Sequence, residues 1–126
     1  MTHVATDILD EGAIVLIHFT AEHTVQDYIA LIDAVLIPHA RQHPALTVHM
    51  VHDMREVQWN FPDFMTYIRS VQNRRRDDPP PANVRHHFVG ASPWLNNWRT
   101  YMMTHYQLET TAFKTIDDAL MYIRDR

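Results

Sequence analysis

Hydrophobic and polar positions along the chain follow two periods, one typical of strands and one typical of helices. Short runs rich in β-branched and apolar residues predict strands at 3–9, 13–19, 46–53, 84–90 and 108–113. Between them, apolar residues recur every three or four positions, which predicts helices over 24–43, over 60–76, from 92 onward and over 115–124. The order ββαβαβαβα predicts an α/β fold with a mixed, mostly parallel five-stranded sheet and about four helices.

Turn and capping residues sharpen the boundaries of these elements. Gly12 stands between the first two strands, where a hairpin turn needs an unusual backbone angle. Pro38 is expected to kink or loosen the last turn of the first helix. Three helix starts carry capping residues, namely Thr24 with Asp27, Ser92 before Pro93, and Thr115 with Asp118.

Composition limits the class of protein. The 126 residues, with 46% hydrophobic and 21% charged residues, predict one globular domain over 1–126. A net charge of −4 gives no general attraction to nucleic acid or to an anionic membrane. Cysteine is absent from the sequence, which excludes disulfides and thiolate chemistry. With no apolar run near the ~20 residues of a membrane span and no signal-like start, we expect a cytoplasmic protein.

Two stretches resemble a known family. "HHFVGASPWLNNW" (86–98) is similar to a late strand, a short turn and an aromatic-bearing helix of STAS domains and SpoIIAA-like proteins. "AFKTIDDALMYI" (112–123) is similar to the last strand, capped turn and closing helix of the same family. The resemblance implies this α/β fold over nearly the whole chain.

The resemblance also bears on function. STAS domains of the anti-sigma antagonist type are small regulators that a kinase phosphorylates on a serine just after the middle strand. In the matching stretch "VHDMREVQWN" (51–60), Asp53 is present but no serine follows, so we expect no phosphorylation switch of this kind. Other members of the wider group resemble lipid-binding Sec14-type domains, which keeps binding of an apolar ligand open.

Three histidines fall on one face of the predicted sheet. Strand alternation puts His18, His49 and His87 on the face opposite Val48 and Met50. Three imidazoles on neighbouring strands could hold zinc, with water as a fourth ligand. The competing and favoured interpretation is that these side chains line a partly polar surface or a dimer interface, with no metal. Adjacent His86 and His87 point to opposite faces and cannot chelate together.

A second candidate site lies at the carboxyl ends of the parallel strands, where open α/β sheets usually bind ligands. The residues expected to line this cleft are Thr20, Asp53, Arg55, Gly90, Ser92 and Trp94, with Trp59 as a further apolar wall. The chain has only two glycines and no phosphate-binding glycine motif, so a nucleotide loop is not expected. In the helix that follows, Leu95, Trp98, Met102 and His105 are expected to face the core, and Trp94 and Tyr101 to lie on a flank.

These patterns favour a small non-enzymatic binding or regulatory module that acts through protein contact and forms a homodimer. No catalytic residue, metal or cofactor is assigned. The alternative is a domain that binds a small apolar or anionic ligand in the strand-end cleft. A metal-dependent enzyme using the three histidines comes third.

Overall fold

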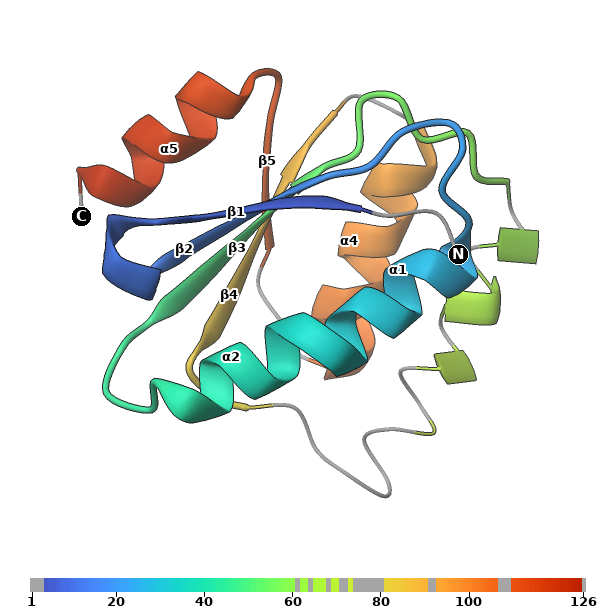
Figure 1. Ribbon diagram of the computed structural model, residues 1–126. Helices are drawn as coiled ribbons and strands as arrows, with labels where there is room; N and C mark the ends of the chain where they lie inside the picture. The colour runs from blue at the N-terminus through green and yellow to red at the C-terminus, as the bar shows by residue number, and fades with distance from the viewer. Residues whose placement is uncertain are drawn as a thin grey trace.

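A five-stranded mixed sheet forms the centre of the computed structural model (Figure 1). The structure describes residues 4–60, 62, 63, 65–67, 69, 70, 73, 81–90, 93–106 and 110–125, without the side chains of Pro93, Trp94 and Tyr106. The strands are β1 (Ala5–Leu9), β2 (Ile14–His18), β3 (Val48–Asp53), β4 (Val84–Val89) and β5 (Thr110–Phe113). They lie in the order β1-β2-β3-β4-β5, with β1 antiparallel to β2 and the other pairs parallel. The α/β class and the five-stranded mixed sheet are therefore confirmed.

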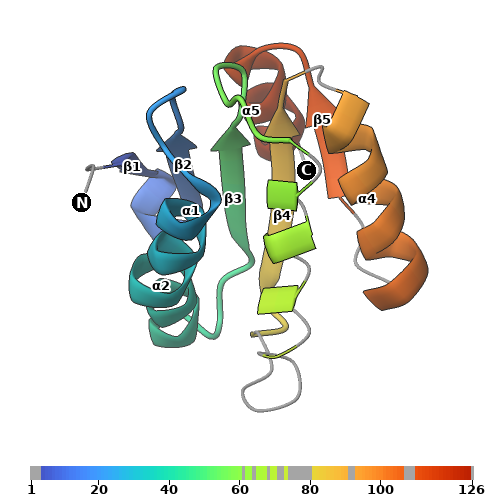
Figure 2. The same ribbon diagram turned by 90° about the vertical axis from the view of Figure 1, so that its right-hand side faces the viewer.

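The order of the strands determines where the helices lie. Because each parallel strand is added on the same side of the previous one, right-handed crossovers bring every connecting helix to one face of the sheet. Helices α1 (Val25–Leu31), α2 (Ile37–Gln42) and α4 (Pro93–Tyr106) share that face, and described residues between 62 and 73 are helical as well. Helix α5 (Ile116–Arg124) follows the last strand and lies on the opposite face (Figures 1 and 2).

The two faces carry separate hydrophobic clusters. The larger cluster lies under the connecting helices and includes Val15, Ile17, Met50, Phe88 and Trp98. The smaller cluster packs α5 on the sheet through Ala119 and Ile123, against Ile14, Leu16, Val51 and Val89. The second face is thus partly covered by a helix, whereas the sequence led us to expect an open, partly polar face.

The first connecting helix departs from regular α-geometry at one point. Residues Ile32–Leu36 form a π-helical turn between α1 and α2, in which the N–H of Ile37 donates to the carbonyl of Ile32. Pro38 explains the turn, because its ring would collide with the carbonyl four residues earlier and it has no N–H to donate. The effect of Pro38 is confirmed, but it lies in the turn before the proline and not in the last turn of the helix.

Predicted caps and turns are largely present. Thr24 and Asp27 form the reciprocal capping box of α1, and the Thr115 hydroxyl accepts from the N–H of Asp118 at 3.1 Å. The hairpin turn between β1 and β2 has Gly12 at φ +98°, together with positive φ at two preceding non-glycine residues. The Ser92 cap lies outside the described residues. The predicted helix over 60–76 was expected to bury Met65 together with Phe61, Phe64, Ile68 and Val71; Met65 is partly buried against the larger cluster, and the other four lie outside the described residues.

Candidate functional site

Four ionisable side chains form a row across the carboxyl ends of β2 and β3, which we call the strand-end row: Asp7, His18, Asp53 and Arg55. The sheet register pairs His18 of β2 directly with Asp53 of β3, so that the two side chains share a face. Nδ1 of His18 lies 3.2 Å from a carboxylate oxygen of Asp53, and Nε2 lies 3.3 Å from Asp7 of β1. The imidazole therefore bridges two carboxylates from different strands.

Asp53 is the central member of the strand-end row. Its side chain is only 8% exposed, and Arg55 holds both of its oxygens, with Nε donating at 2.8 Å and Nη2 at 3.0 Å. Burial raises the pKa of the Asp53 carboxyl, but hydrogen bonds from Arg55 and His18 outweigh this effect and leave the pKa below its usual value. Asp53 is thus a buried, ionised anchor, whereas the Arg55 side chain is 47% exposed.

The structure brings together part of the predicted cleft. The backbone of Gly90 lies against the backbone of Met54 and Arg55, since a Cβ built on Gly90 would lie 3.6 Å from the Met54 carbonyl. Gly90 adopts a φ of +148°, which explains why glycine occupies this position. Thr20 contacts a local partner instead, because its N–H donates to Nδ1 of His23 at 2.8 Å. Ser92 and the Trp94 side chain lie outside the described residues.

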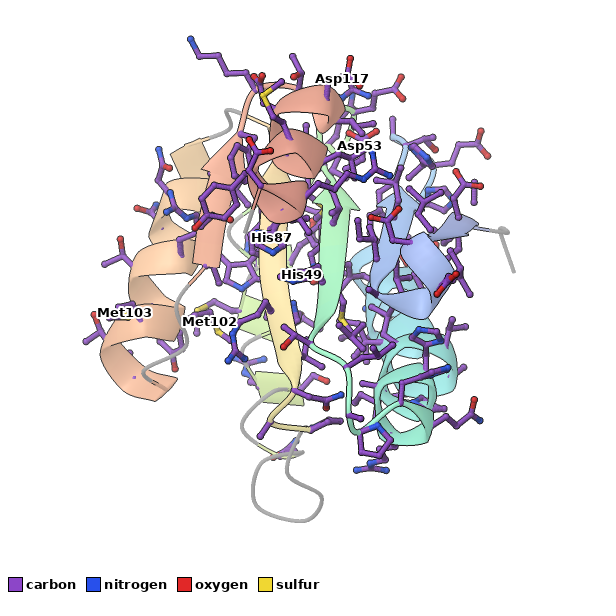
Figure 3. The ribbon with its side chains drawn as sticks, turned by 90° about the vertical axis from the view of Figure 1, so that its left-hand side faces the viewer. His49, Asp53, His87, Met102, Met103 and Asp117 are labelled. Atoms are coloured by element: carbon purple, nitrogen blue, oxygen red, sulfur yellow. The ribbon has the colours of Figure 1, made fainter. Side chains whose placement is uncertain are left out.

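The three histidines predicted to share a face do so, but they do not form one cluster. His49 and His87, which we call the outer His pair, meet through Nδ1 and Nε2 at 2.9 Å (Figure 3). His18 lies further along the strands, beside Asp53 and not beside these two rings. In the part of the chain that the structure describes, no three His, Asp or Glu side chains are grouped closely enough to hold a metal ion.

Helix α5 changes the surroundings of the outer His pair. His87 is buried, contacts the ring of Tyr122 on α5, and places its Nδ1 2.6 Å from the Thr111 hydroxyl. His49 is partly exposed, and burial together with the nearby positive charge of Arg85 lowers its pKa. The pair is therefore packed beside a helix, rather than displayed on an open surface.

A second histidine pair was missed by the sequence analysis. His52 and His86, which we call the inner His pair, lie on the face of β3 and β4 that the connecting helices cover. Nε2 of His52 lies 3.0 Å from Nδ1 of His86. His52 also contacts the Tyr28 hydroxyl at 3.2 Å, so the three side chains form a hydrogen-bonded chain inside the core. Strand alternation could have found it, since His52 has the same parity as Val48 and Met50.

The inner His pair is strongly desolvated. Burial lowers the pKa of His86 to about 4, and burial together with the neighbouring imidazoles lowers the pKa of His52 well below its ordinary value. Both rings are therefore neutral at pH 7, and their hydrogen bonds satisfy polar atoms that would be costly to bury alone.

Aromatic residues placed in the cleft or on the flank by the sequence analysis belong mainly to the core. Trp59 is buried against the rings of Tyr28 and Trp98, and its indole N–H donates to the His23 carbonyl, so it is not a cleft wall. Tyr101 is half-buried against the same cluster. Leu95, Trp98 and Met102 face the core as predicted, whereas His105 is exposed and was assigned wrongly.

Comparison with known proteins gives no assignment for the chain. Neither the models of known protein families nor the curated proteins contain a match to this sequence. Among the described residues, no helix is long and apolar enough to cross a membrane.

Proposed function

We propose that this protein is a STAS/SpoIIAA-like, non-enzymatic cytoplasmic module that binds another protein through the strand-end row. One observation carries the proposal: each member of the row contacts the next, in the order Asp7, His18, Asp53 and Arg55. Acidic and basic groups therefore alternate across three neighbouring chain segments. A row of this kind presents a defined pattern of charge that a partner of complementary pattern would recognise.

The exposure of the row supports contact with a protein surface. Asp53 is buried and holds its neighbours in place, while the side chains of Asp7 and Arg55 are 62% and 47% exposed. An arginine whose guanidinium is already fixed by a bidentate pair loses little conformational entropy on binding. Arginine is accordingly enriched among residues that dominate the binding energy of interfaces.

Binding of a small ligand at the same strand ends is the second candidate. The closeness of Gly90 to the Met54–Arg55 backbone favours it, because glycine lets a ligand approach the main chain there. An anionic group would then bind to the exposed side of Arg55. We rank this second because the members of the row are spread over the surface of three segments.

The test compares Arg55→Gln with Arg41→Gln, which removes an exposed arginine from α2 near the amino ends of the strands. Each variant and the wild type would be used for cross-linking capture from the source cell, and the captured protein would then be purified and titrated by calorimetry. We expect Arg55→Gln to weaken binding of that partner about tenfold or more, and Arg41→Gln to leave it unchanged.

Two results would contradict the proposal. One is an identical set of captured proteins, with identical affinities, for the wild type and Arg55→Gln. The other is a small molecule retained by the wild type in native mass spectrometry and lost in Arg55→Gln, which would assign the row to a ligand. The same spectra report the homodimer that the sequence led us to expect.

A further inference from the structure

β5 is one of the two edge strands of the sheet, with β1 at the other edge, and helix α4 lies beside it. Among the strands that the structure describes, β5 pairs with β4 alone, so one side of its backbone faces away from this sheet. The carbonyl of Phe113 accepts from the N–H of Gly90, which shows that Phe113 and, by alternation, Thr111 direct their backbone groups towards β4. Thr110 and Ala112 therefore direct theirs outward.

Of these two outward-facing residues, one is already engaged. Nη2 of Arg99 on α4 donates to the Thr110 carbonyl at 3.0 Å, and Nε donates to the Thr110 hydroxyl at 3.3 Å. No residue that the structure describes takes the N–H or the carbonyl of Ala112, which is exposed. An edge with an open donor and acceptor at the same residue is a template for another strand.

A groove runs beside this edge. It has a volume of about 580 Å³ and is lined by one face of α4 and by the start of β5, through Asn96, Arg99, Thr100, Met103, Thr104 and Thr110. Met103, labelled on α4 in Figure 3, is 55% exposed although it is a large apolar side chain. Arg99 is the charged member of this lining, and no carboxylate is among the six side chains.

We propose that an extended acidic segment of another protein adds to β5 as a sixth strand. The backbone of the segment pairs with Ala112, and its side chains on one face enter the groove, where a carboxylate binds Arg99 and an apolar side chain covers Met103. This is the strand-addition mode of peptide recognition, in which main-chain hydrogen bonds give affinity and alternate side chains give specificity. The site is separate from the strand-end row and does not depend on the function proposed above.

Charge argues against a second copy of this chain as the occupant. Antiparallel pairing of β5 with its own copy about Ala112 would place Thr110, which is hydrogen-bonded to Arg99, opposite Lys114 of the other chain. Like charges facing each other across a strand pair are destabilising. An acidic segment instead neutralises the cations of this edge.

The probe is a fluorescently labelled eight-residue peptide of repeating Val-Val-Glu-Glu, compared with its lysine counterpart by anisotropy. In an extended strand this repeat places valine and glutamate in turn on each face. The test variant is Ala112→Pro, which removes the outward N–H at an edge position where proline is tolerated. Its matched control is Ala112→Val, which keeps the N–H and favours a strand. Arg99→Gln tests the charge in the groove.

We expect the acidic peptide to bind the wild type and Ala112→Val alike, and to bind Ala112→Pro about tenfold or more weakly. The lysine peptide should bind at least tenfold more weakly than the acidic peptide, and Arg99→Gln should reduce that preference. Equal affinity for Ala112→Pro and the wild type, equal affinity for the two peptides, or no saturable binding to the wild type would overturn the proposal.

A readout that needs no variant protects the test against misfolding of Ala112→Pro. Peptides methylated on alternate backbone nitrogens lose their donors on one edge only. One of the two methylation registers should abolish binding to the wild-type protein, while the other retains it. If both registers bind as well as the unmethylated peptide, strand addition is wrong.

Discussion

The inner His pair makes the stability of the fold depend on pH in a way that can be calculated. Burial lowers the pKa of His86 from 6.5 to about 4. Between these two pH values the imidazole of His86 is protonated in the unfolded chain and neutral in the folded protein. Because the unfolded state then binds more protons, the free energy of unfolding decreases as the pH falls from about 6.5 to about 4. Below about 4 both states bind the proton, and this loss stops growing.

The size of the effect follows from the same values. One excess proton in the unfolded state is worth about 1.4 kcal/mol for each pH unit, so His86 alone removes up to about 3 kcal/mol between pH 6.5 and 4. Residue His86 as a whole keeps some exposure to solvent, so this value is an upper limit. His52 is fully buried and its pKa is lowered well below its ordinary value, so it adds a loss of the same sign.

The assay is urea unfolding between pH 4.5 and 7.5, followed by the fluorescence of Trp59 and Trp98, which are buried in the folded protein. The perturbation is His86→Gln, whose amide can still contact His52 but cannot bind the proton. We expect the slope of unfolding free energy against pH to fall by about one proton, roughly 1.4 kcal/mol per pH unit, in the middle of the range.

The control is His105→Gln, which makes the same substitution at an exposed imidazole on α4, outside the inner His pair. The comparison uses slopes and not absolute stabilities, because His86→Gln also alters packing. If the slope of His86→Gln equals that of the wild type, the inner His pair does not titrate on unfolding and the argument fails.

Three further substitutions test individual contacts by thermal or urea unfolding at neutral pH. Asn83→Ala removes the side-chain amide that donates to three backbone carbonyls, and should lower the free energy of unfolding by about 1–3 kcal/mol. A decrease below about 0.5 kcal/mol would show that these contacts do not stabilise the fold. Gly90→Ala places an alanine at a φ of +148°, and should lower the free energy of unfolding by about 1–3 kcal/mol. An unchanged unfolding midpoint would show that the backbone at this turn relaxes without cost. Tyr28→Phe takes the hydroxyl away from buried His52 and should cost about 1–3 kcal/mol; a neutral result would mean that water or another group replaces it.

The sequence was sufficient for the sheet and for many of its boundaries, because their causes are local. Gly12, Thr24 and Thr115 act on the backbone within three or four residues, and the structure confirms each of these turns or caps. Alternation along β3 and β4 likewise placed His49 and His87 on one face. Such signals are read without knowledge of the partner strand.

The composition of the candidate sites depended on register, which the sequence does not give. In the sheet register His18 lies two residues beyond the level of His87 and four beyond the level of His49. This offset decides whether three histidines meet, or one histidine and two carboxylates. The position of α5 was also decisive, because it buries His87 on a face that alternation alone left open. The family resemblance stays a prediction, and so do the expected homodimer and partner.

The agreement between strand order and sequence order has a consequence for how the chain folds. Every strand pairs with the strand next to it in the sequence, so the loop that must close before each pairing is a single connection. Folding rates of small domains fall as the mean sequence separation of contacting residues rises. We therefore expect this chain to reach its native state faster than an α/β protein of equal length whose strands are shuffled, with the sheet extending one strand at a time.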